Sequence, residues 1–233
     1  MLMNEVLDEI LHDKAILEKY AEIDKINPYP FSHGMKHILN VVALVDKIAP
    51  VFNLTKREVF VLKVCEILHD LGQVDGREKH GEKAAAFATD YLLKFDTFTG
   101  NEISDICSAI ATHDEHSDYA RLENKYSWFV NLIDKMDFSR DRLEDWCEKK
   151  FGYTAYQDIK QVDFALKNNT FIIYIKLIQS PKVMTEDLIY DYRGRFFNKV
   201  YYTAKEFCNH FGYKLDIKLN GKSLTLKRFE IGE

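Results

Sequence analysis

The chain has 233 residues, of which 46% are hydrophobic and 30% are charged, and its formal net charge is −5 at pH 7. This is the ordinary composition of a globular protein, long enough for one good-sized core and in no need of a disulfide staple. The net negative charge gives no general attraction to nucleic acid or to acidic lipid, so neither is an expected partner.

Cysteine usage and hydropathy indicate where the protein works. The four cysteines lie far apart without a Cys-x-x-Cys pair, which favours a reducing compartment. No apolar run approaches the roughly 18 residues that a membrane span needs. The first 20 residues intersperse charged with apolar side chains, as in an amphipathic helix and unlike a signal peptide. We therefore expect a cytoplasmic protein that contacts no membrane.

Helices are expected along the first 155 residues. The segment Asn27–Pro30 ends a first helix, and Ser32 is a candidate N-cap for a second helix over residues 33–49. Thr55-Lys56-Arg57-Glu58 has the form of a capping box and opens a third helix that runs to His69, with Gly72 as the stop signal. Apolar periodicity predicts further helices over 78–95, 102–113, 126–137 and, more briefly, 140–150.

After about residue 156 the pattern changes. Residues 161–167 and 170–177 flank Asn168–Asn169 and are typical of two strands with a turn, and residues 186–211 are typical of a long amphipathic helix. Asn220–Gly221 then joins two alternating segments, 214–219 and 223–226, which predicts a second hairpin. We expect a mainly α protein: a helical bundle over residues 1–155 and a small C-terminal α+β module, hairpin–helix–hairpin, over residues 156–233.

A set of imidazole and carboxylate residues lies within or at the ends of these apolar helices. A carboxylate beside a core stripe is costly unless it is paired, hydrogen-bonded or bound to metal. Nitrogen and oxygen ligands together suit borderline and hard divalent ions such as Zn, Mn, Fe or Mg. Taken singly, each residue has an ordinary explanation, such as a packed or capping histidine, but the ordered set indicates a metal site. Its members are His37, His69, Asp70, His80, His113 and Asp134.

The order of these residues resembles the HD phosphohydrolase superfamily, which is named after its His-Asp pair. His33-Gly34-Met35-Lys36-His37 is similar to the opening motif, whose second histidine is the ligand. Ile67-Leu68-His69-Asp70-Leu71-Gly72-Gln73 is similar to the signature motif, and Leu132-Ile133-Asp134-Lys135-Met136-Asp137 to the closing motif. The resemblance covers about residues 30 to 145 and implies that the helical bundle is an HD domain.

The resemblance also implies a ligand set. His37, His69, Asp70 and Asp134 would hold a first divalent ion. His80 and His113 match positions that, where both are filled, often accompany a second ion bridged by the aspartate of the pair. Alternatively, these two histidines contact phosphate directly or are polar pocket residues without metal. The number of ions and the choice among Mn, Fe, Co, Ni, Zn and Mg stay open.

The implied reaction is hydrolysis of a small phosphate ester, with a nucleotide as the favoured substrate. A bound metal lowers the pKa of its water towards about 7 and polarises the phosphate. Asp70 would also orient that water, and His113 or His116 would protonate the leaving oxygen. Basic residues near the site are candidates for holding the substrate phosphate, although a solvated surface charge is the more common explanation for each. They are Lys36, Arg77, Lys83, Arg140 and Arg142.

The motifs of two specialised branches of the family are absent from this sequence. The chain lacks the acidic pair that follows the His-Asp pair in guanosine-polyphosphate hydrolases, and it lacks the Gly-Tyr-Pro element of the cyclic-dinucleotide branch at its expected place. Two alternatives share the ligand set: a di-iron oxygenase, and a non-catalytic ligand sensor whose aromatic C-terminal module is an effector or dimerisation surface. Whether the protein forms a homodimer stays open.

Overall fold

The computed structural model describes residues 2–114, 119–152, 154–178 and 195–224. The chain separates into two compact units, residues 1–134 and residues 135–233. The domain boundary predicted near residue 155 lies later in the chain and stays a prediction. In the described parts of the chain, no helix has both the length and the apolar character required to cross a lipid bilayer.

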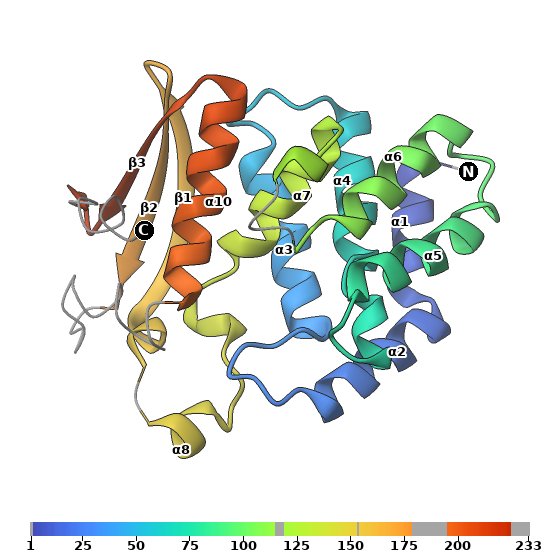
Figure 1. The fold of residues 1–233 in the computed structure, drawn as a ribbon, viewed down its shortest axis with the longest axis horizontal. Coiled ribbons are helices and arrows are strands. Elements are labelled where there is room, and N and C mark those ends of the chain that lie inside the picture. The colour runs from blue at the N-terminus through green and yellow to red at the C-terminus, as the bar shows by residue number, and fades with distance from the viewer. Residues whose placement is uncertain (1, 115–118, 153, 179–194, 225–233) are drawn as a thin grey trace. The chain divides into compact units, whose positions relative to one another are not determined.

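The first unit is helical, and from residue 33 onwards its helices begin and end close to the predicted positions. Figure 1 shows α5 and α6 side by side, and the two make many contacts. The α-helices are α1 (Met3–His12), α2 (Lys14–Ile26), α3 (Met35–Ile48), α4 (Lys56–Leu68), α5 (His80–Leu92), α6 (Gly100–Ala111) and α7 (Lys125–Met136). Two 3-10 turns join them, η1 (Leu71–Asp75) and η2 (Tyr119–Arg121).

Capping boxes determine where α4 and α6 begin. At α4 the Thr55 hydroxyl accepts a hydrogen bond from the Glu58 amide at 3.2 Å, and the Glu58 carboxylate accepts one from the Thr55 amide at 2.7 Å. Thr99 and Glu102 repeat this exchange at α6. The capping box predicted at Thr55 is therefore confirmed, and each box satisfies amides that the first turn leaves without helical partners.

The N-terminal segment forms two helices, so the prediction of one continuous first helix is wrong. Asp13 takes an extended conformation after α1, and its carboxylate accepts a hydrogen bond from the Ala15 amide at 2.8 Å. An aspartate at this position satisfies a free amide of the next helix and starts a new axis. Apolar periodicity continues on both sides of Asp13, which is why it did not reveal the break.

The second unit contains a four-stranded sheet in the order β1-β2-β3-β4. The pairs β1/β2 and β3/β4 are antiparallel and confirm the two predicted hairpins, whereas β2 and β3 are parallel. The unit's elements are η3 (Arg140–Arg142), α8 (Cys147–Phe151), η4 (Ala155–Asp158), β1 (Ile159–Lys167), β2 (Thr170–Leu177), α10 (Arg195–Phe211), β3 (Lys214–Leu219) and β4 (Lys222–Ser223). The single short helix predicted over 140–150 is thus a 3-10 turn followed by α8.

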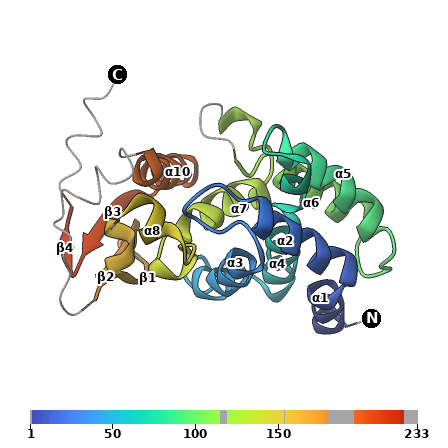
Figure 2. The ribbon, with the colours of Figure 1, turned by 90° about the horizontal axis from the view of Figure 1, so that it is seen from below.

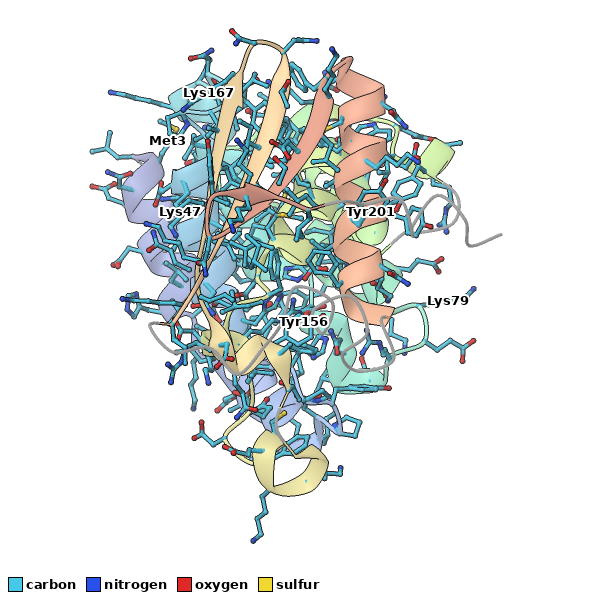
Figure 3. The ribbon with its side chains drawn as sticks, turned by 90° about the vertical axis from the view of Figure 1, so that its left-hand side faces the viewer. Met3, Lys47, Lys79, Tyr156, Lys167 and Tyr201 are labelled. Carbon is cyan, nitrogen blue, oxygen red and sulfur yellow. The ribbon has the colours of Figure 1, made fainter. Side chains whose placement is uncertain are left out.

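Helix α10 covers one face of this sheet. Phe171 and Phe207 bring their ring centroids within 6.1 Å of each other, and Phe171, Ile173 and Ile175 of β2 are all buried. Figures 2 and 3 show α10 alongside the strands, with Tyr201 on the helix and Lys167 at the end of β1. The mainly α fold with a small α+β extension is as predicted. Residues 186–194 and 225–226 of the predicted elements, and His116, lie outside the described residues.

Candidate metal centre

His37 lies in the first turn of α3, on the face that the helix buries. Its side chain is inaccessible to solvent, as are those of Ile38 and Val41 beside it. At residue 34 a glycine leaves room for the Asp24 side chain of α2: a Cβ there would lie 1.9 Å from Oδ1 of Asp24. The start of the helix therefore points an imidazole into the interior of the unit.

His69 and Asp70 lie where α4 ends and the chain turns into η1. The Tyr20 hydroxyl donates a hydrogen bond to the Ile67 carbonyl at 2.6 Å, which ties α2 to this last turn. Nδ1 of His69 donates to the Glu66 carbonyl at 2.9 Å. Both side chains of the pair are buried, so the end of α4 presents an imidazole and a carboxylate inside the fold.

Close backbone packing around two glycines brings His80 and His113 together. A Cβ on Gly72 of η1 would lie 2.0 Å from the His80 carbonyl oxygen, and a Cβ on Gly81 would lie 2.8 Å from the Ala111 carbonyl oxygen. The start of α5 therefore fits tightly between η1 and the end of α6. As a result, Nε2 of His80 lies 3.0 Å from Nε2 of His113.

Asp134 lies in the last turn of α7. Its Oδ1 lies 3.1 Å from Nε2 of His37 and 4.0 Å from Nε2 of His69. One turn earlier on the same helix, Nδ2 of Asn131 donates a hydrogen bond to the His113 carbonyl at 2.8 Å. This bond links α7 to the end of α6, so it helps to hold Asp134 and His113 in one cluster.

The two carboxylate oxygens of Asp70 face different histidines. Oδ1 lies 3.5 Å from Nε2 of His80 and 3.4 Å from Nε2 of His113. Oδ2 lies 3.5 Å from Nε2 of His69 and 4.0 Å from Nε2 of His37. Asp70 thus stands between two ligand groups, one of which also includes Asp134.

In their neutral forms, three histidines of the cluster turn no hydrogen-bond donor towards its centre. Nδ1 of His69, His80 and His113 each bond to a backbone carbonyl, at 2.9, 2.9 and 2.7 Å. A carbonyl only accepts, so each Nδ1 carries the proton and a neutral ring turns a bare Nε2 lone pair inwards. Those lone pairs meet one another and the Asp70 carboxylate, an arrangement that requires a positive charge between them.

Protons supply that charge when no metal is bound. Burial by itself opposes the charged forms, but the neighbouring imidazoles, His69 first, hold the pKa of the Asp70 carboxyl well below its usual range. Burial would likewise lower the pKa of His69, yet the charge of Asp70 outweighs it and raises that pKa to about 9. Burial is the largest influence on His113 and lowers its pKa, which keeps that ring neutral.

The donor set fits a divalent metal. Nε2 of His69 and Oδ2 of Asp70 are buried without a hydrogen-bond partner. Ligand atoms bound about 2.1 Å from one ion lie about 3.0–3.4 Å from their neighbours, and the separations here are 3.0 to 4.0 Å. The six predicted ligands form three overlapping groups whose ligand atoms lie within 4.8 Å of one another. The structure thus brings all six together, while their roles as ligands stay predictions.

The predicted phosphate-binding residues are divided between the two units. Arg77 lies three residues before the start of α5, and its carbonyl is the acceptor for Nδ1 of His80. The Lys83 ammonium donates a hydrogen bond to the Asp75 carbonyl at 2.8 Å. Lys36 is exposed at the start of α3. Arg140 and Arg142 belong to the second unit, and Arg142 is buried beside Asp137.

Some residues around the cluster escaped the sequence analysis. Glu66 is fully buried one turn before His69, and Tyr20 and Asn131 bind the backbone of the ligand-bearing turns. The spacing of Glu66 and His69 by three residues is a signal that was readable, because it places both on one helix face. Tyr20 is 47 residues from its partner and gives no local signal.

Part of this chain matches a known protein family. Residues 34–139 match the HD domain family. The crystal structure of a predicted HD superfamily hydrolase from an uncultured Thermotogales bacterium is 20% identical, covers 59% of this chain and 74% of its own, and superposes with a TM-score of 0.43. No curated protein shows significant similarity to the chain. HD domains bind divalent metals, and the match spans His37, His69, Asp70, His80, His113 and Asp134. Residues 34–139 are therefore a domain of the HD superfamily.

Proposed function

We propose that this protein is a metal-dependent phosphohydrolase that cleaves a small phosphate ester, with a nucleotide as the favoured substrate class. The observation that carries the proposal is the division of the Asp70 carboxylate between two histidine groups, each able to hold a cation. The HD domain match and the buried His/Asp cluster support a hydrolase that depends on metal.

In the proposed site, His37, His69, Asp70 and Asp134 would hold one ion, and His80 and His113 would hold a second together with Asp70. The metal supplies Lewis acidity, which activates water and offsets charge on the phosphoryl oxygens. Asp70, held between the two groups, would orient the attacking water. If only one ion binds, His80 and His113 are instead placed to contact the phosphoryl group and to deliver a proton to the leaving oxygen.

A row of side chains beside the cluster favours a substrate that has both a phosphate and a flat base. The Arg77 guanidinium lies 4.7 Å from the centre of the Tyr29 ring. That ring lies 6.1 Å from His33, which lies 6.2 Å from His37. A guanidinium held over an aromatic ring keeps donors available for phosphate oxygens, and the part of the Tyr29 ring that Arg77 leaves exposed offers a surface on which a base can stack.

Phosphate release from a panel of nucleotides, with Mn, Fe, Co, Ni, Zn or Mg added in turn, tests the proposal. We expect turnover with at least one metal, and at least a 100-fold lower rate in Asp70→Ala, which removes the carboxylate shared by both groups. Elemental analysis of the same two proteins shows whether the rate follows metal content. If metal-loaded protein released no phosphate from any nucleotide, the proposal would fail. Oxygen uptake by the iron-loaded protein would then favour the oxygenase alternative.

A further inference from the structure

Glu66 is a carboxylate in the interior of α4, behind the metal centre. Its side chain is inaccessible to solvent, and so are those of its chain neighbours Cys65 and Ile67. Burial of a carboxylate is opposed by the loss of its hydration, so an apolar side chain would pack this position at lower cost. The charge therefore calls for a reason other than packing.

Glu66 contacts His69 in two ways. Its backbone carbonyl accepts the Nδ1 proton of His69 at 2.9 Å, and its own Oε2 lies 3.7 Å from the same nitrogen. The hydrogen bond selects the tautomer that points Nε2 at Asp70. The carboxylate adds a negative charge behind the ring, and such a charge makes the opposite nitrogen a stronger metal ligand.

The charge balance of the centre favours the same role. Asp70 and Asp134 are the carboxylates among the six candidate ligands, and together they match the charge of a single divalent ion. Two divalent ions would leave an excess of positive charge in a buried site. Glu66 places a third carboxylate next to the ligands, 3.7 Å from Nδ1 of His69.

We propose that Glu66 is a positioning residue that strengthens metal binding through His69. This inference rests on the metal centre proposed above but not on the reaction proposed for it. Glu66 does not reach the cluster itself; it acts by holding the ring of His69 and by raising the basicity of its Nε2.

Calorimetric titration of the metal-free protein with Zn²⁺ and with Mn²⁺ gives the Kd for each ion and tests this role. Glu66→Gln keeps the volume of the side chain and removes its charge. We expect the Kd for metal to rise about 10- to 100-fold. The matched control is Glu58→Gln on the same helix, where the carboxylate caps α4 and pairs with Lys125. Its Kd should equal that of the wild type.

Urea denaturation of the metal-free proteins measures the cost of each substitution apart from metal. Both variants should lose stability, Glu66→Gln because it leaves the protonated His69 ring beside a neutral amide and Glu58→Gln because it loses its pair with Lys125, so only the Kd for metal should distinguish them. If Glu66→Gln bound metal with the wild-type Kd, or lost stability without losing affinity, Glu66 would be structural and the proposal wrong.

A second variant keeps the test decisive if Glu66→Gln folds poorly. Glu66→Met also removes the charge at similar volume and should show the same rise in Kd; if neither variant folds even with metal present, the role is structural. A wild type that binds neither ion overturns both this inference and the metal centre. A wild type that binds metal but cleaves no nucleotide overturns only the proposed reaction.

Discussion

Arg77 makes one contact through its backbone and another through its side chain. Its carbonyl holds Nδ1 of His80, while its guanidinium stacks on Tyr29. Replacement of Arg77 by glutamine leaves the backbone carbonyl in place and removes only the charged guanidinium group. The backbone bond to His80 should therefore survive the substitution.

We expect Arg77→Gln to raise KM for a phosphorylated substrate about 10-fold, in line with the loss of one charge-assisted contact to phosphate, and to leave kcat and metal content nearly unchanged. Steady-state kinetics with the best substrate of the nucleotide panel measure this. Lys79→Gln is the control, because Lys79 is an exposed side chain that points away from the ribbon in Figure 3. An unchanged KM would remove Arg77 from the substrate site.

Metal binding should release protons at neutral pH. The pKa of His69 is raised to about 9 by Asp70, against the effect of burial, so its ring is protonated at pH 7 in the metal-free protein. Burial opposes the charge of His80 too, but Asp70 also raises that pKa. A metal needs the bare Nε2 and must displace these protons.

Calorimetric titration with Zn²⁺ in two buffers of different ionisation enthalpy should show the release of at least one proton at pH 7. The affinity for metal should increase as the pH rises from 7 to about 9, because the competing proton is lost over this interval. Above that pH the buffer dependence should disappear. Equal heats in both buffers at pH 7 would contradict the assignment of His69 as a ligand.

At the scale of elements, the position of α5 depends on two glycines. Gly72 and Gly81 let the start of α5 approach η1 on one side and the end of α6 on the other, closer than any side chain would permit. This close approach, rather than the length of the connecting segments, sets the 3.0 Å separation of His80 and His113.

Gly72→Ala should displace α5 and weaken the group formed by Asp70, His80 and His113. We expect a loss of about 1–3 kcal/mol in the free energy of unfolding, as for other overpacked sites, and a reduced occupancy of the second ion. Urea denaturation and elemental analysis give the two quantities. Gly100→Ala in α6 is the matched control, because its Cβ would enter open space and alanine favours the helix. Wild-type metal content in Gly72→Ala would show that metal binding does not need the close approach of η1 and α5.

At the scale of the whole molecule, the six candidate ligands all lie in the unit formed by residues 1–134. The sheet of the second unit contributes none of them. We therefore predict that a fragment of residues 1–155 keeps near-stoichiometric metal. If the second unit supplies substrate specificity, the same fragment loses most of its hydrolytic activity.

Elemental analysis and the phosphate-release assay on fragment and full-length chain check this prediction. A fragment that retains full activity would show that the second unit is dispensable for the reaction. Loss of metal from a folded fragment would show that the second unit is needed to build the centre. Sedimentation of both proteins would also test the dimerisation role considered for the C-terminal module.

The sequence by itself determined the helical nature of the first unit, the two hairpins and the identities of the candidate ligands. Capping boxes, apolar periodicity and Asn-Gly turns act between neighbours in the chain, so they can be read without the fold. Asp13 shows the limit, because the same periodicity runs through a break that a single side-chain hydrogen bond creates.

Only the tertiary structure decided how these parts meet. It joined the two hairpins through the parallel pair β2/β3, it divided the oxygens of Asp70 between two histidine groups, and it placed Glu66 behind His69. Each of these depends on distances of a few ångströms between segments far apart in the chain. Local propensity carries no information about such distances; they follow from close packing, here from backbones that meet at Gly72 and Gly81.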